Sequence, residues 1–230
     1  MKTVVIIPAG GTGRRMGGEI PKQYLLLAGI PILAHTLSAF QRSPLVDEII
    51  LAVPEGDIVE VWRTVVERYD FSRVRLVLAG GRERQDSVKN ALAHVCDEHG
   101  VIVIHDGVRP FVTGDLIERA IAGAKKYGAV STGVPVRDTV KEVDEAGRVV
   151  KTVPREGLWL TQTPQAFRRE VILAAYERAA ADGFYGTDDA SLVERTGIPV
   201  RMIIGDKDNI KVTTPEDLVQ GEMIIYGRKK

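Results

Sequence analysis

Short apolar runs alternate with longer amphipathic segments in the N-terminal half of the chain, and this alternation constrains the fold more than any other feature. The apolar runs are residues 3–7, 48–53, 74–78, 101–104 and 129–134. Apolar side chains recur at helical spacing in residues 32–41, 58–68, 86–95 and 115–126. The first four runs are apolar almost throughout, as in strands buried on both faces of a parallel sheet. The pattern predicts a Rossmann-like α/β fold: a mostly parallel sheet with helices on both faces.

The alternation breaks after Pro135. Residues 137–154 indicate two polar strands around a turn at 144–147, too polar for the centre of a sheet. We therefore expect a projecting β-hairpin arm, which would pack against a second subunit because isolated hairpins are marginally stable. Helical patterns resume in three segments, with a further strand at 200–204; the helical segments are residues 168–182, 188–195 and 215–226. With no repeat or linker, we expect one domain, 1–230, carrying the arm.

Composition limits the possible partners. Lys+Arg and Asp+Glu both number 31, and this neutral balance argues against a general nucleic-acid binder. No apolar stretch is long enough to cross a bilayer and no leader pattern precedes the first strand, so we expect a cytoplasmic protein without membrane contacts. The single cysteine, Cys96, excludes an intrachain disulfide and a cysteine-based zinc site, and we expect it to be a buried structural thiol.

The first strand leads into a glycine-rich loop followed by basic residues. Residues 8–16 read PAGGTGRRM, and Lys22 follows Pro21 just beyond them. Glycines expose backbone N–H groups and let a phosphate approach the main chain closely. The spacing is not that of a dinucleotide-binding turn, and no Walker Lys-Ser or Lys-Thr follows. The pair Arg14 and Arg15 beside bare amides instead favours a ligand with several phosphate charges.

Ligands of such a sheet bind at the carboxyl ends of its strands, where the loops after Ile7, Leu78 and Ile104 should converge. The second of these loops holds Gly80 and Gly81 and leads into a helix that Asp86 or Ser87 could cap. In the third, His105 is expected to be a hydrogen-bonded structural residue. The neighbouring Asp106 is the better functional candidate, because its carboxylate could bind hydroxyl groups or magnesium with its waters.

Motifs along nearly the whole chain resemble one family. GGTGRRM (10–16) with PKQ (21–23) resembles the signature of nucleotidyltransferases that join a nucleoside monophosphate to a phosphorylated sugar or polyol. Later motifs follow in the family's order: HDGVRP (105–110), VRDT (136–139), REGLW (155–159), QTPQ (162–165) and NIKVT (209–213). Together they resemble the 2-C-methyl-D-erythritol 4-phosphate cytidylyltransferase family of the non-mevalonate isoprenoid pathway, from Thr3 to about Tyr226.

The resemblance implies a CTP site built from both glycine loops, with Ser87 as a hydrogen-bonding contact near the cytosine ring. The implied CTP-binding residues are Ala9, Gly10, Gly11, Thr12, Gly13, Arg14, Arg15, Lys22, Gly80, Gly81, Ser87, Asp106 and Gly107. Those implied for the acceptor, methylerythritol phosphate, are Asp106, Arg109, Thr139, Arg155, Thr163, Thr187, Asp188 and Lys211. Thr139 and Arg155 would reach into the neighbouring subunit's site, which implies a homodimer formed through the arm.

The implied reaction is in-line attack of the acceptor phosphate on the α-phosphorus of CTP, which releases pyrophosphate. A phosphomonoester has a second pKa of about 6, so the nucleophile is already ionised and no general base is expected. The resemblance assigns the catalytic charges to Arg15, Lys22, Arg155 and Lys211. Mg²⁺ would be held mainly by the triphosphate rather than by protein ligands.

Other functions stay open at this point. A ribitol 5-phosphate cytidylyltransferase shares the glycine loop and NIKVT, but REGLW and VRDT fit the methylerythritol family better. The second alternative is a catalytically inactive nucleotide-binding regulator. The presence of Arg15, Lys22, Asp106 and Lys211 argues against it. A dinucleotide oxidoreductase is disfavoured, because the second strand ends at Val53-Pro54 without an acid for the ribose.

Overall fold

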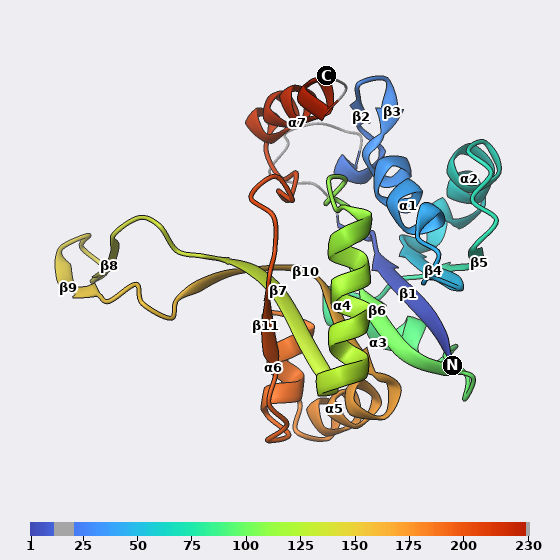
Figure 1. Ribbon diagram of the computed structural model, residues 1–230. Coiled ribbons are helices and arrows are strands. Elements are labelled where there is room, and N and C mark those ends of the chain that lie inside the picture. The colour runs from blue at the N-terminus through green and yellow to red at the C-terminus, as the bar shows by residue number, and fades with distance from the viewer. Residues whose placement is uncertain (12–20, 229–230) are drawn as a thin grey trace.

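A seven-stranded sheet forms the centre of the computed structural model, which describes residues 1–11 and 21–228 (Figure 1). The strand order is β11-β7-β10-β6-β1-β4-β5. The strands are β1 (Lys2–Pro8), β4 (Glu48–Val53), β5 (Val74–Ala79), β6 (His99–Ile104), β7 (Ala129–Pro135), β10 (Trp159–Arg168) and β11 (Arg201–Ile204). All pair in parallel except β10, which runs antiparallel to β6 and β7. The predicted Rossmann-like, mostly parallel sheet is confirmed.

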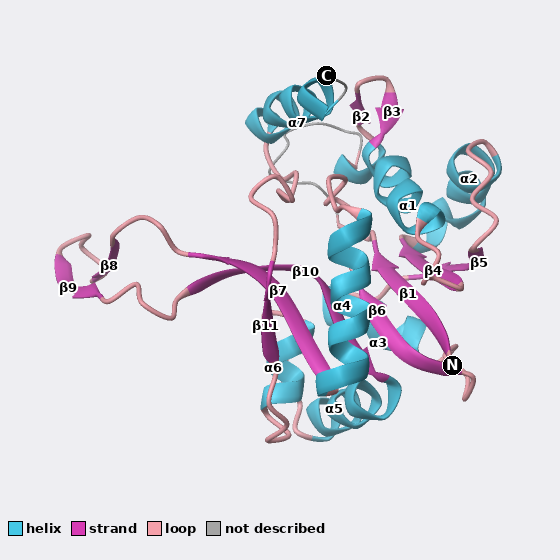
Figure 2. Ribbon diagram, in the orientation of Figure 1, coloured by secondary structure: helices cyan, strands magenta, loops and turns pink. Residues whose placement is uncertain are grey.

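Helices cover both faces of the sheet, as Figure 2 shows. One face carries α1 (Ile32–Arg42), α4 (Gly114–Tyr127) and α2 (Ile58–Val61). The short 3-10 turn η3 (Glu55–Asp57) precedes α2, and the π-helix η4 (Trp62–Glu67) continues it. The other face carries α3 (Arg84–Leu92), α5 (Arg169–Ala181) and α6 (Asp189–Glu194). Side chains alternate along β1, so Val5 and Ile7 enter the first core and Val4 and Ile6 the second. Burial on both faces explains why residues 4–7 of this strand are all apolar.

Strand β10 was not predicted from the sequence. Its buried polar groups are paired: Gln165 donates from Nε2 to Ser131 Oγ over 2.9 Å, and the carbonyl of Pro164 accepts from Oγ1 of Thr132 in β7 over 3.0 Å. Because these hydrogen bonds replace apolar packing, hydropathy does not mark the segment as a central strand. The insertion of β10 between β6 and β7 brings residues 161–165 to the carboxyl edge of β6.

The hairpin of β8 (Val140–Val143) and β9 (Val149–Val153) projects from the body and confirms the predicted arm (Figure 1). Its turn is organised by Asp144, whose Oδ1 accepts hydrogen bonds from the backbone N–H groups of Ala146 and Arg148. Gly147 adopts a φ of +75°, which favours glycine. Nearly all side chains of the two strands are exposed.

A third apolar cluster lies at the end of the molecule where the strands of the main sheet terminate. It joins the short hairpin of β2 (Leu26–Leu27) and β3 (Ile30–Pro31) to α7 (Pro215–Arg228) through Leu27, Phe111 and Val212. The 3-10 turn η2 (Lys22–Tyr24) precedes this hairpin. The cluster therefore anchors the segments that carry Lys22 and Lys211 beside the sheet edge.

Cys96 is exposed, so the expected buried thiol is wrong. Helix α3 ends at Leu92 rather than near residue 95, which leaves Cys96 in the turn before β6 instead of on a buried helix face. The helix also starts differently: its N-cap is Glu83, and Asp86 at the third position accepts from the Glu83 N–H over 3.0 Å. Among residues 1–11 and 21–228, no helix has the length and apolar character needed to span a membrane.

Candidate active site

A pocket of about 290 Å³ opens at the carboxyl ends of β1, β5 and β6, and we call it the nucleotide pocket. It brings together most of the predicted CTP-binding residues that the structure describes: Ala9, Gly10, Gly11, Lys22, Gly81, Ser87 and Asp106. The convergence of the three loops is thus confirmed. The predicted residues Thr12, Gly13, Arg14 and Arg15 lie outside the described residues.

Gly80 and Gly107 do not line this pocket but allow its loops to approach one another. A Cβ at Gly80 would lie 2.8 Å from Ser87 Oγ, and one at Gly107 would lie 2.9 Å from the Cβ of Ala9. Both separations are shorter than Cβ contacts normally are, so a side chain at either position would force a neighbouring group to shift. The N–H of Gly107 also donates to the carbonyl of Pro8 over 3.2 Å, which ties the loop after β6 to the loop after β1.

Ser87 shapes the second glycine loop from within. Its side chain is buried, and its Oγ accepts from the Gly81 N–H over 3.0 Å while donating to the carbonyl of Glu83 over 3.2 Å. Both bonds hold the loop against the first turn of α3. The role of Ser87 as a cytosine contact stays a prediction.

A second pocket of about 220 Å³ adjoins the first, and we call it the acceptor pocket. Six of the eight residues predicted to bind the acceptor line it: Asp106, Arg109, Thr163, Thr187, Asp188 and Lys211. Three residues line both pockets, namely Arg84, Asp106 and Lys211. The two cavities therefore meet at a shared wall of charged side chains.

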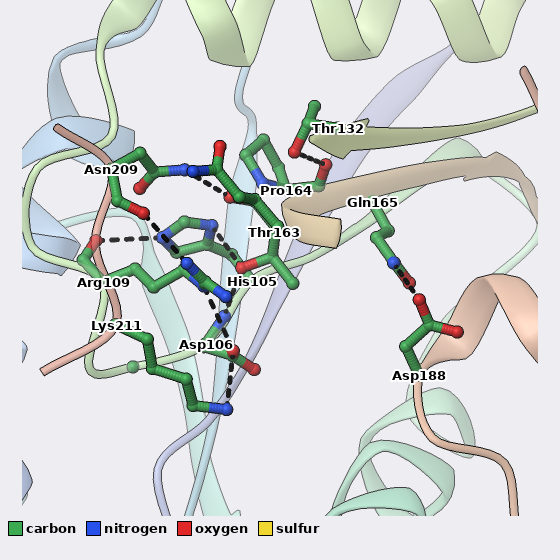
Figure 3. Close-up of polar contacts among 12 residues, drawn as sticks. His105, Asp106, Arg109, Thr132, Thr163, Pro164, Gln165, Asp188, Asn209 and Lys211 are labelled. Carbon is green, nitrogen blue, oxygen red and sulfur yellow. Dashed lines mark hydrogen bonds and ion pairs between the residues drawn. The ribbon is translucent and has the colours of Figure 1, made fainter. Parts of the chain in front are cut away.

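Asp106 is the centre of that wall (Figure 3). Its Oδ1 lies 2.9 Å from Nε of Arg84, and its Oδ2 lies 3.0 Å from Nζ of Lys211 and 3.4 Å from Nε of Arg109. Burial acts to raise the pKa of Asp106, but the charges of Arg84, Lys211 and Arg109 hold this pKa well below its usual range. The carboxylate is therefore ionised and positions the cations between the two pockets.

A chain of hydrogen bonds fixes the backbone beneath Asp106. The Asp106 N–H donates to Thr163 Oγ1 over 3.0 Å, and this hydroxyl donates to His105 Nδ1 over 3.0 Å. Nε2 of His105 then carries the proton and donates to the carbonyl of Arg109 over 3.1 Å. Burial lowers the pKa of His105 to about 4, so the ring is neutral. His105 is the structural residue that the sequence analysis predicted.

Asn209 anchors the segment that carries Lys211. This role was not predicted from the sequence. Its Nδ2 donates to the carbonyl of Thr163 over 2.8 Å, and its backbone carbonyl accepts from the guanidinium of Arg109 over 2.9 Å (Figure 3). Three residues after Asn209, the Val212 N–H donates to the carbonyl of Val108 over 2.9 Å. These bonds hold Lys211 against the loop after β6.

Thr139 and Arg155, at the base of the arm, are exposed and line neither pocket as formed by the described residues. Arg155 donates from a terminal guanidinium nitrogen to the carbonyl of Arg137 across the hairpin. The structure does not bring these two side chains to those of the other predicted site residues that it describes. Their contribution to a neighbouring subunit's site stays a prediction.

The described residues hold no cluster of three or more His, Cys, Asp or Glu side chains suited to a metal ion. The carboxylate oxygens of Asp106 already face three cations. The expectation that Mg²⁺ is held mainly by the triphosphate stays a prediction.

Comparison with known proteins now identifies the family. The family model described as 2-C-methyl-D-erythritol 4-phosphate cytidylyltransferase matches residues 3–227. The chain belongs to this family. A family member from Geobacter metallireducens is 54% identical over 228 residues, covering 98% of each chain, and one from Syntrophus aciditrophicus is 51% identical over 224 residues, covering 97% of this chain and 96% of the relative.

A solved structure supports the same assignment. The 4-diphosphocytidyl-2C-methyl-D-erythritol synthase of Anaerococcus prevotii superposes with a TM-score of 0.86 at 32% identity, covering 98% of this chain and 96% of that one. The family assignment and the fold therefore agree, and the chain is a cytidylyltransferase by family.

Proposed function

We propose that the chain transfers CMP from CTP to 2-C-methyl-D-erythritol 4-phosphate and releases pyrophosphate, forming 4-diphosphocytidyl-2-C-methyl-D-erythritol for isoprenoid biosynthesis. One observation carries the proposal within this family: two pockets meet at a wall made of Arg84, Asp106 and Lys211. A donor in one pocket and an acceptor in the other would meet across that wall.

The nucleotide pocket supplies contacts suited to a triphosphate. Its first loop presents the backbone at Gly10 and Gly11, and Lys22 lies beside this loop, with its Cε 3.4 Å from where a Gly11 Cβ would be. Backbone N–H groups and a lysine stabilise charge that develops on phosphate oxygens as the α-phosphorus becomes pentacoordinate. Arg15 would add a second cation, and Mg²⁺ would arrive on the triphosphate.

The acceptor pocket supplies cations for the attacking phosphate. Lys211 stands at the shared wall and would offset the repulsion between the acceptor dianion and the triphosphate. No general base is needed, because the acceptor phosphate is ionised at neutral pH. We infer that Arg155 and Thr139 complete this pocket from the arm of a second subunit in a homodimer.

Pyrophosphate release tests the proposal. The full chain is incubated with MgCTP and 2-C-methyl-D-erythritol 4-phosphate, with ribitol 5-phosphate, or without acceptor. Release with the methylerythritol phosphate alone is the expected result. Release with ribitol phosphate alone would keep the chemistry and overturn the acceptor, and no release from folded, CTP-binding protein would favour a regulator.

A further inference from the structure

Arg84 lines both pockets, yet no role in binding or catalysis has been assigned to it. It is the first residue of α3 and follows directly on the second glycine loop. Its guanidinium bridges two carboxylates: Nε lies 2.9 Å from Asp106 Oδ1, and a terminal nitrogen lies 2.8 Å from Asp189 Oδ2. Arg84 therefore connects the shared wall to a residue outside both pockets.

Asp189 contacts the guanidinium of Arg84 from outside the two pockets. Its side chain is 1% exposed and lines neither pocket of the described chain. Its Oδ1 accepts a hydrogen bond of 2.6 Å from the hydroxyl of Tyr176, a buried residue of α5. The adjacent Asp188 differs, because it lines the acceptor pocket and caps α6 by accepting from the Ser191 N–H. The two neighbouring aspartates thus have separate tasks.

The chemistry of the guanidinium suits a bridge. It is planar and presents donors along more than one edge, so it can bind two carboxylates in different directions, which a lysine ammonium on the same stem does less well. Asp106 and Asp189 together offset its charge, which makes Arg84 a poor free cation for a phosphate. Its effect falls instead on Asp106, the carboxylate that pairs with Lys211 and Arg109.

We propose that Arg84 is a positioning residue: Asp189, held by Tyr176, orients Arg84, which holds Asp106 and so sets the place of Lys211 between donor and acceptor. The proposal rests on the proposed function, since it concerns the geometry of that transfer. It predicts that residues touching neither substrate control the rate of CMP transfer through a single chain of contacts.

The first test compares Asp189→Asn and Tyr176→Phe with wild type in the pyrophosphate assay, with kcat and both KM values measured. Asp189→Asn keeps the shape and removes the charge, and we expect kcat to fall at least tenfold while the KM for CTP changes less than threefold. Tyr176→Phe should lower kcat in the same direction by a smaller factor. Unchanged kcat in folded Asp189→Asn protein would overturn the proposal.

Tyr185→Phe is the matched control. This exposed tyrosine donates to Asp86 Oδ1 over 3.0 Å in the first turn of the same helix, but outside the chain of contacts through Arg84. Its kcat should stay within twofold of wild type. Circular dichroism and Tm verify that each variant is folded, and a loss of kcat as large in Tyr185→Phe as in Tyr176→Phe would contradict the proposal.

The second test asks whether Asp189 acts through Arg84. We expect Arg84→Gln and the double variant Arg84→Gln with Asp189→Asn to have the same kcat within twofold, because removal of the bridge removes the influence of Asp189. If the two substitutions lower kcat by factors that multiply in the double variant, the inference is overturned. A wild-type kcat in Arg84→Lys would also overturn it, since the charge at this position would then suffice. If the wild-type protein shows no turnover in the pyrophosphate assay, that result contradicts the proposed function rather than this inference.

Discussion

Lys22 lies beside the glycine loop, and replacing it with alanine tests the contribution of its charge. Lys22→Ala should lower kcat by about 10²–10³, because one electrostatic contact to the transferring phosphate is commonly worth this much. Steady-state pyrophosphate release measures the loss, and circular dichroism establishes that the fold is kept. Lys89→Ala, an exposed lysine of α3, is the control and should match wild type. A Lys22→Ala kcat within tenfold of wild type would contradict the assignment.

His105 predicts a pH dependence of stability. Burial lowers its native pKa to about 4, whereas an unfolded imidazole titrates at about 6.5. Above pH 6.5 the ring is neutral in both states and this contribution to stability is fully present. Below it only the unfolded chain takes up the proton, so the free energy of unfolding falls towards pH 4 by up to about 3 kcal/mol.

Urea unfolding of wild type and His105→Gln at several pH values between 4 and 7 measures this contribution. Other groups titrate in both proteins, so the difference between the two curves is the informative quantity. Wild type should lose more stability than the variant as the pH falls. Parallel curves would show that His105 does not contribute a titrating proton.

At the scale of elements, the first turn of α3 is tied to the segment between α5 and α6. Gln85 donates from Nε2 to the carbonyl of Phe184 over 2.9 Å, and its Oε1 accepts from the Gly186 N–H over 2.9 Å. This segment leads into Thr187 and Asp188 of the acceptor pocket. Helix α3 therefore joins the nucleotide loop to the acceptor side.

Gln85→Ala should loosen that tie and raise the KM for the acceptor about tenfold, with a smaller change for CTP, because two hydrogen bonds are lost. Amide hydrogen exchange in residues 184–188 should become faster in the same variant. Asn90→Ala serves as the control. Asn90 lies later in α3, and the variant removes its exposed hydrogen bond to the carbonyl of Ala79 in β5. Equal changes in both KM values would contradict a specific link to the acceptor side.

At the scale of the whole molecule, the arm predicts a site shared between subunits. Arg155→Ala and Lys211→Ala should each be nearly inactive alone. Mixed under conditions that allow subunit exchange, they should recover about a quarter of wild-type activity, since half of the dimers are mixed and each mixed dimer holds one intact site. Mixed dimers, detected by mass, that remain inactive would exclude contribution of Arg155 to the partner's site.

Sequence patterns located the parts of the site that follow directly on strands. Gly10 and Gly81 come after apolar runs, Asp106 ends another, and parallel strands bring their carboxyl ends to one edge, so the convergence of these loops was predictable. The sequence patterns assigned no role to Arg84, Asn209 or Asp189, which the structure connects to the site. The first two contact the loop after β6 across large sequence separations, and Asp189 reaches that loop only through Arg84.

The sequence by itself determined the sheet, its two covering layers, the projecting arm and the family, because hydrophobic periodicity and contiguous motifs are local properties of the chain. Tertiary structure decided the insertion of β10, whose buried polar groups are satisfied only by partners such as Ser131 and Asp188. It also decided which charges meet at Asp106. Arg84 and Lys211 from distant segments join Arg109 of the same loop, and together these three cations offset the cost of burying that carboxylate. No local pattern encodes the meeting of the two distant cations with Asp106.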